Sequence, residues 1–396
     1  MRLPYALLPV LVATIVPGAA AQTFDPRPTW QFHPSLYTLG STDESTDLPF
    51  GNPGLDIGEA SPAANVAAAL DFGREAARDR LRGSFFGLLR SPFDGGDRSF
   101  FGAGRIEAAH QVGSGGRLTF TDGLKIQERP QLEASDYWGN AATLRGEWSW
   151  PSGRGVSVQV GDRRRTLSEL EILGFSRQSA GLGFFTPLGA RWRGELSADF
   201  QHYAAPTATG ERLVMGAEFG AFTRKGIATL RFAWFEPISD ERRIDTDTDE
   251  PGEEIEFGDI GRAEFFEILA LQGSYGAVLG DAFFLDPLQS DSDEWDFGRR
   301  KQVLTGFASR RLGERTTAAA FLRLQRKRGP NLLVPEGAAD AVSFADDRFE
   351  IRGAFRYQVR RRVALLLQGA YVKNWSERPS LEFFRLLGAF GVQIQF

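Results

Sequence analysis

The sequence predicts an all-β protein, a transmembrane antiparallel up-and-down β-barrel of about 16 strands, within a range of roughly 14–18. Three observations predict this fold: an export signal at the N-terminus, an apolar strand at the C-terminus, and alternation of apolar and polar residues between them. Strands of such a barrel turn one face to lipid and the other to an aqueous interior. We expect short turns on the periplasmic side and long loops on the extracellular side.

The first residues are organised as a secretory signal peptide. Arg2 precedes a mostly apolar run over residues 6–16, and Ala19-Ala20-Ala21 places small residues before Gln22. The prediction for the whole chain is a signal peptide over 1–21, a short periplasmic segment over 22–29 and a barrel over 30–396.

The mature chain has to reach a stable fold without disulfide bonds, because the sequence contains no cysteine. Beyond the signal peptide we find no run of about 18 apolar residues, which excludes α-helical membrane spans. A closed barrel is the remaining way to pair every backbone polar group within a membrane. The 33 Phe and 8 Trp agree with this, because aromatic residues form girdles at the two membrane interfaces.

The last strand has the most specific pattern in the chain. Its apolar face ends with Phe390, Val392, Ile394 and Phe396, whereas Gln393 falls on the opposite face. A strand of this kind resembles the C-terminal signal that delivers bacterial outer-membrane barrels to the barrel assembly machinery. The resemblance implies the cell outer membrane of a Gram-negative-type bacterium, with that machinery, outer-membrane lipids and lipopolysaccharide as partners. The alternative is the edge strand of a soluble sandwich.

Two segments illustrate the alternation best. In 191–201, apolar residues such as Leu196 and Phe200 alternate with charged residues, and residues 348–360 repeat the pattern. The segment Phe265–Leu285 alternates poorly. It is either a hairpin, which would give about 18 strands, or part of one large outer loop, which would give about 16; we favour the loop.

The polar face of the strands contains the candidate functional residues. Arginine is more frequent there than acidic residues, although the chain as a whole has a net charge of -5. The candidates for residues that line the lumen are Arg191, Arg193, Glu195, Asp199, Arg323, Arg352 and Arg356. Two interpretations stay open: the arginines make the lumen prefer anions, or Arg–Glu ladders brace the wall.

One acidic segment has the spacing of a calcium loop. Asp245, Asp247, Asp249 and Glu256 match acidic positions 1, 3, 5 and 12 of that loop, but Glu250 stands where the loop requires glycine. An acidic solvated loop explains the same residues, and bridging of lipopolysaccharide phosphates by divalent ions is compatible with either interpretation.

Catalysis has few candidate residues. The three histidines are His33, His110 and His202, and the last two share the predicted lipid face with apolar residues. A nucleophile and a base on one common face are not evident, so we expect no enzyme activity. We also expect no cofactor and no nucleic-acid partner.

Short motifs resemble a β-barrel family found beside exopolysaccharide biosynthesis and export proteins. They are Pro34-Ser35-Leu36, Arg78-Asp79-Arg80-Leu81, and Asn374-Trp375-Ser376-Glu377-Arg378-Pro379 before the terminal strand with Arg385. The Asp-Asp-Asn of many such barrels is replaced here by Ser41-Thr42-Asp43-Glu44-Ser45. The resemblance implies a barrel in the outer membrane and a connection with polysaccharide.

The function that the sequence predicts is a porin-like or export channel for a polar or anionic solute, with polysaccharide as one candidate. The transported solute itself is unknown from the sequence. The competing interpretation is a non-conducting surface protein whose extracellular loops bind a partner or the lipopolysaccharide layer.

Overall fold

A computed structural model describes residues 30–45, 63–93, 99–128, 137–167, 175–205, 208–223, 225–242, 300–329, 344–376 and 383–396. The predicted signal peptide and the short segment that follows it lie outside these residues. No helix within the described ranges is long and apolar enough to cross a membrane.

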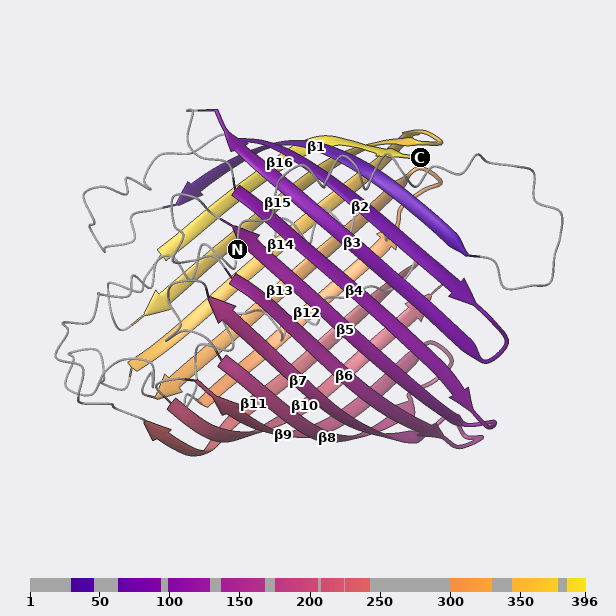
Figure 1. The fold of residues 1–396 in the computed structure, drawn as a ribbon, viewed down its shortest axis with the longest axis vertical. Coiled ribbons are helices and arrows are strands. Elements are labelled where there is room, and N and C mark those ends of the chain that lie inside the picture. Colours follow the sequence, from indigo (N-terminus) through magenta and orange to yellow (C-terminus); the bar gives the residue numbers. More distant parts are fainter. Residues whose placement is uncertain are drawn as a thin grey trace.

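The described residues form a closed barrel of 16 antiparallel strands, which confirms the predicted fold class (Figure 1). The strands are β1 (Gln31–Ser45), β2 (Ala63–Glu75), β3 (Asp79–Pro92), β4 (Ser99–Val112), β5 (Gly116–Glu128), β6 (Tyr137–Ser149), β7 (Gly155–Leu167), β8 (Phe175–Pro187), β9 (Trp192–Ala204), β10 (Ala208–Thr223), β11 (Gly226–Arg242), β12 (Arg300–Arg311), β13 (Thr316–Gly329), β14 (Phe344–Arg360), β15 (Val363–Ser376) and β16 (Phe383–Gln395). Each strand pairs with its neighbours in the sequence, so the topology is up-and-down.

The barrel closes where the first strand meets the last. β1 and β16 pair in antiparallel register from Ser35 opposite Gln395 to Ser45 opposite Arg385. Beyond the end of β16, the backbone N–H of Phe396 donates a hydrogen bond of 3.1 Å to the carbonyl of Pro34. Pro34 lacks a backbone donor but still accepts this bond, so a proline is tolerated at this point of the seam.

The outer face is apolar through the middle of the strands. On β14, Ile351, Phe355 and Tyr357 are exposed, whereas Arg352 and Arg356 between them are only partly exposed. Such exposed apolar rows are stable against hydrocarbon and not against water, so this face is the lipid-facing surface.

A few polar residues lie among the apolar residues on the outer face of β5, β6 and β7. Asn140 Nδ2 donates to Asp122 Oδ1 at 2.8 Å, and Arg164 Nε lies 3.1 Å from Asp162 Oδ2. The register aligns Asp122, Ala142 and Asp162 across three neighbouring strands.

Most connections alternate between short and long as the sequence predicts, but β9 and β10, where a long loop is expected, are joined by residues 205–207 alone. The turn between β8 and β9 covers residues 188–191, with Gly189 at φ 117°, a conformation that disfavours other residues. β11 pairs directly with β12, so the barrel closes without residues 243–299. The segment Phe265–Leu285 lies outside the described residues, and the 16 strands match the strand number expected if it is not a hairpin of the wall.

The assignment of faces predicts opposite results for two neighbouring substitutions. Phe355→Arg places a cation against hydrocarbon and should lower the free energy of unfolding by roughly 2–4 kcal/mol near the membrane midplane. Ala354→Arg, the matched control, points to the interior and should fold nearly normally. Urea unfolding of barrels inserted in lipid vesicles measures both, and equal losses would contradict the assigned register.

The seam predicts a defect in assembly when the terminal residue is removed. Deletion of Phe396 should leave export intact and sharply reduce insertion, because Phe396 completes the apolar row of β16 and its N–H joins the seam to β1. The control Phe396→Tyr keeps an aromatic terminus and should insert. Heat-modifiable mobility on gels reports insertion, and normal insertion of the deleted form would count against the assembly signal.

Candidate functional site

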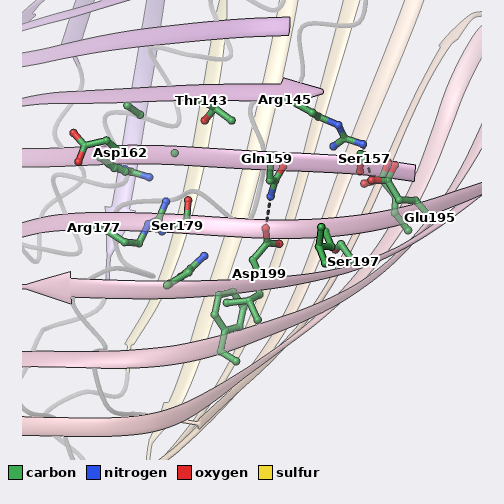
Figure 2. A pocket seen from close by; sticks show the side chains of 18 of the residues that line it. Thr143, Arg145, Ser157, Gln159, Asp162, Arg177, Ser179, Glu195, Ser197 and Asp199 are labelled. Atoms are coloured by element: carbon green, nitrogen blue, oxygen red, sulfur yellow. Dashed lines mark hydrogen bonds and ion pairs between the residues drawn. The ribbon is translucent and has the colours of Figure 1, made fainter. Parts of the chain in front are cut away.

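A polar recess of about 260 Å³ lies on the inner wall between β6 and β11 (Figure 2). Hydroxyl groups of Thr143, Ser157, Ser179 and Ser197 line it, together with charged groups. The charged residues whose strand positions face inward are Arg145, Arg163, Arg177, Glu195, Asp199, Glu218 and Arg231. The recess is therefore a hydrophilic surface with charges of both signs.

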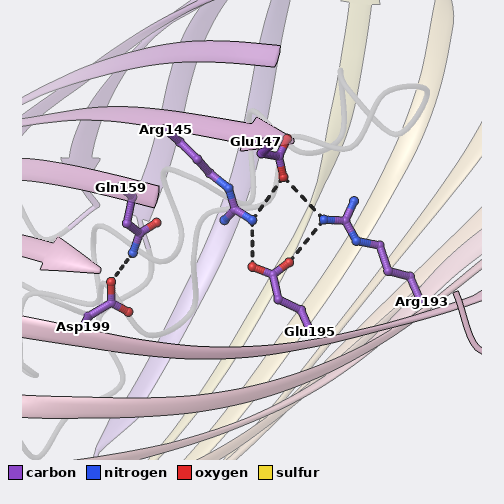
Figure 3. Close-up of polar contacts among 6 residues, drawn as sticks. All are labelled: Arg145, Glu147, Gln159, Arg193, Glu195 and Asp199. Carbon is purple, nitrogen blue, oxygen red and sulfur yellow. Dashed lines mark hydrogen bonds and ion pairs between the residues drawn. The ribbon is translucent and has the colours of Figure 1, made fainter. Parts of the chain in front are cut away.

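Four of the inward-facing residues form a closed ion cluster between β6 and β9 (Figure 3). Arg145 Nη2 lies 2.7 Å from Glu195 Oε1 and 3.1 Å from Glu147 Oε1. Arg193 Nη2 lies 3.4 Å from Glu147 Oε1 and 3.3 Å from Glu195 Oε2. Two cations and two carboxylates cancel, so this cluster adds no net charge to the lumen.

The cluster spans two intervening strands because their side chains are small. Ser157 of β7 and Gly183 of β8 are paired positions beneath it. A Cβ on Gly183 would lie 3.3 Å from Glu195 Oε1 and 2.5 Å from Ser157 Oγ. A larger residue at this position would push Glu195 away from Arg145, so the sequence of β8 is part of the site.

Two arginines face each other on the wall of the recess. Arg163 of β7 and Arg177 of β8 are cross-strand partners, and Arg165 follows on the same face of β7. Arg163 and Arg165 are buried. The register therefore brings like charges close together on this part of the wall, an arrangement that neighbouring groups have to compensate.

The structure brings three of the predicted lumen residues together and separates a fourth. Arg193, Glu195 and Asp199 occupy inward-facing positions of β9. Arg193 also lies over the ring of Phe185, at 4.1 Å from its centroid. Arg191 shares their parity in the sequence but lies in the turn before β9, where it is exposed. It is therefore outside the strand wall.

The other three predicted residues lie in a different sector, on β13 and β14. Arg323 is 1 % exposed and opposite Glu350, which is fully buried and forms an ion pair with Arg352. Arg356 Nε donates to Gln393 Oε1 at 3.0 Å, across β15. These arginines have partners in the wall, as the bracing interpretation expects.

Arg177 and Gln159 are not among the residues that the sequence predicts to line the lumen. Both face the recess, and Gln159 Nε2 donates a hydrogen bond to Asp199 Oδ1. β8 begins at Phe175, so Arg177 lies on the N-terminal side of the apolar row formed by Ala180, Leu182 and Phe184. Every second residue of a strand lies on the same face, so extending the alternation from residue 181 back to residue 177 places Arg177 on the polar face.

The candidate calcium ligands Asp245, Asp247, Asp249 and Glu256 lie outside the described residues. Within the described ranges, no group of three or more His, Asp and Glu residues is arranged to hold a metal ion. The residues of the assembly signal are in β16 and just beyond it, where Phe390, Ile394 and Phe396 are exposed on the outer face.

Comparisons with known proteins give a limited result. No protein-family model matches the chain, and no curated protein matches it, so the resemblance to exopolysaccharide-associated barrels gains no support. The outer membrane protein OprD from Pseudomonas aeruginosa is 8 % identical with a TM-score of 0.47, over 92 % of this chain and 94 % of that chain. OccD3 (OpdP) of the same organism is 6 % identical with a TM-score of 0.47, over 92 % and 91 %. OccAB3 of Acinetobacter baumannii is 10 % identical with a TM-score of 0.43, over 92 % and 99 %. Likeness at this level transfers no function to this chain.

The class of protein follows from the barrel itself. A closed antiparallel barrel with an apolar outer band and a polar inner wall is the membrane-spanning architecture of the Gram-negative outer membrane. The protein is therefore an integral outer-membrane β-barrel.

The ion cluster predicts that Arg145 supports stability. Arg145→Gln removes the cation nearest to Glu147 and Glu195 and should lower the free energy of unfolding by about 1–2 kcal/mol. The control Arg164→Gln breaks an exposed pair with Asp162 and should cost less than about 1 kcal/mol. Unfolding in lipid vesicles compares the two. Equal, small effects would mean that the cluster does not brace the wall.

Proposed function

We propose that the protein is an outer-membrane channel that passes small polar solutes and prefers anions. The observation that carries the proposal is the pairing of Arg163 with Arg177 on the wall of a hydrophilic recess inside a closed barrel. Guanidinium groups bind carboxylate and phosphate groups well, and side-chain charges near an ion path set its selectivity.

The distribution of charge in the recess supports the preference for anions. The cluster of Arg145, Glu147, Arg193 and Glu195 is neutral as a whole, and Glu218 is opposite Arg231. Arg163 and Arg177 add two further cations to the inner wall, at facing positions of β7 and β8. Their field would reach about 10 Å into a solution of 0.1 M salt, and less at higher salt.

The proposal keeps to small solutes and leaves polysaccharide out, because the comparisons do not support that cargo. It also contains no catalytic step. Among the described histidines, His110 lies 2.7 Å from an exposed carboxylate of Asp79, and His202 is exposed on the outer face of β9. The barrel assembly machinery and lipopolysaccharide remain part of the proposal as partners, on the basis of the terminal strand and the outer surface.

Reversal potentials across a salt gradient test the proposal. The double variant Arg163→Gln/Arg177→Gln should lower the anion-to-cation permeability ratio by about twofold or more, because it removes both wall cations from the recess. The control Arg193→Gln/Glu195→Gln removes one cation and one carboxylate from the neutral cluster, so it should lower stability and keep the wild-type permeability ratio.

Two outcomes would contradict the proposal in different ways. Correctly inserted protein that leaves a planar bilayer electrically silent would exclude a channel and favour a surface protein that binds through its loops. A conducting protein whose selectivity is the same with and without Arg163 and Arg177 would exclude these residues as its cause.

A further inference from the structure

The wall of the recess has three hydroxyl groups that lie over glycines of neighbouring strands. Gly161 of β7 pairs with Thr143 of β6 on one side and with Ser179 of β8 on the other. A Cβ on Gly161 would lie 2.8 Å from Ser179 Oγ and 3.5 Å from Thr143 Oγ1, so both hydroxyls reach over the glycine. Ser197 of β9 lies over its partner Gly216 of β10 in the same way, because a Cβ there would lie 2.6 Å from Ser197 Oγ. We call Thr143, Ser179 and Ser197, which are labelled in Figure 2, the hydroxyl face.

The hydroxyl face is in contact with solution, whereas the inner wall of β12–β15 is packed. The three residues of the hydroxyl face are each partly exposed. One register row crosses β12–β15 and is almost completely buried; its members are Thr305, Arg323, Glu350 and Val372, with exposed fractions of 3 %, 1 %, 0 % and 3 %. Thr143 and Thr305 are both inward-facing threonines, so their difference in exposure belongs to the two sectors of the wall and not to the residue type.

We propose that solutes pass along the hydroxyl face, on the side of the barrel formed by β6–β9, and that Thr143, Ser179 and Ser197 exchange hydrogen bonds with them. This inference rests on the proposed channel function and adds which sector of the inner wall the solute contacts. The solute class is small molecules or ions that carry hydroxyl, carboxylate or phosphate oxygens, because a hydroxyl group can donate a hydrogen bond to each of them.

Hydroxyl groups suit such a path because they bind weakly. Each donates one hydrogen bond and accepts others, so it can replace part of the water around a passing solute. One such neutral bond gains little net free energy, since it takes the place of a bond to water. Conduction requires several sites that are each weak enough to release the solute, and hydroxyls on β6, β8 and β9 provide them.

The glycines determine how far these hydroxyls reach into the recess. Because Ser179 Oγ lies so close to the place of a Cβ on Gly161, a side chain at 161 would have to displace that hydroxyl from the wall. Gly161 acts through Ser179 and Thr143, so it is a positioning residue and need not touch the solute.

The accessibility of single cysteines tests the path, since the chain contains no cysteine of its own. Ser179→Cys in barrels inserted in a planar bilayer should react with a sulfonated methanethiosulfonate, and the bulky adduct should lower single-channel conductance by about 1.5-fold or more. The matched control Thr305→Cys also exchanges an inward-facing hydroxyl for a thiol, but at a buried position. It should stay unmodified and keep its conductance. Mass spectrometry of the treated protein reports modification independently of conductance.

A pair of glycine variants tests the positioning role. Gly161→Ala should lower conductance, because the methyl group displaces the Ser179 hydroxyl into the recess. Gly123→Ala adds the same group to the inner wall with its nearest neighbour at an ordinary 3.8 Å, and it should conduct like the wild type. Equal conductance of the two variants would overturn the role of Gly161. If Thr305→Cys inserts poorly, Val372→Cys of the same buried row takes its place as the control.

The outcomes separate this inference from the proposed function. A conducting wild-type barrel whose Ser179→Cys variant stays unmodified, or is modified without loss of conductance, would overturn the inference and leave the channel intact. Equal modification of Thr305→Cys would overturn it as well, since both sectors would then face the solution. A silent wild-type barrel would contradict the channel itself and the inference with it.

Discussion

The structure depends on one constraint, which is that every backbone N–H and C=O group inside the membrane has to be paired within the protein. A sheet meets it only by closing on itself, and the pairing of β1 with β16 provides that closure. Closure also fixes the register of every strand. Because side chains alternate with period two, a slip of one residue would exchange the lipid-facing and lumen-facing sets, so the apolar rows and the closure support each other.

The same constraint shapes the interior. Inward positions recur at every second residue, so charged side chains of neighbouring strands come within a few Å of one another and have to be compensated. The wall does so in two ways. On β12–β14, the charged side chains of Lys301, Arg323 and Glu350 are almost completely buried inside the wall, and Glu350 forms an ion pair there with Arg352. On β6–β9, small residues such as Ser157 and Gly183 make room for ion pairs that cross two strands.

The sequence was sufficient for the fold because alternation, turns and terminal signals are local properties of the chain. The site was less predictable, since its contacts depend on which residues of different strands share a row. Arg191 and Arg193 have the same parity, yet only Arg193 lies in a strand. Arg177 was not selected because its strand extends further toward the N-terminus than its apolar residues indicate. The bond between Gln159 and Asp199 joins residues 40 positions apart, across a strand that contributes only a glycine.

A count of arginines on the polar face is therefore a poor guide to the charge of the lumen. Arg193 and Arg352 are the kind of residue that such a count would select, but each forms an ion pair with a carboxylate of the wall. The charge of the inner wall therefore depends on which arginines are paired with carboxylates. Small residues contribute to this pairing, because Ser157 and Gly183 leave room for the ion pair of Arg145 with Glu195 across two strands.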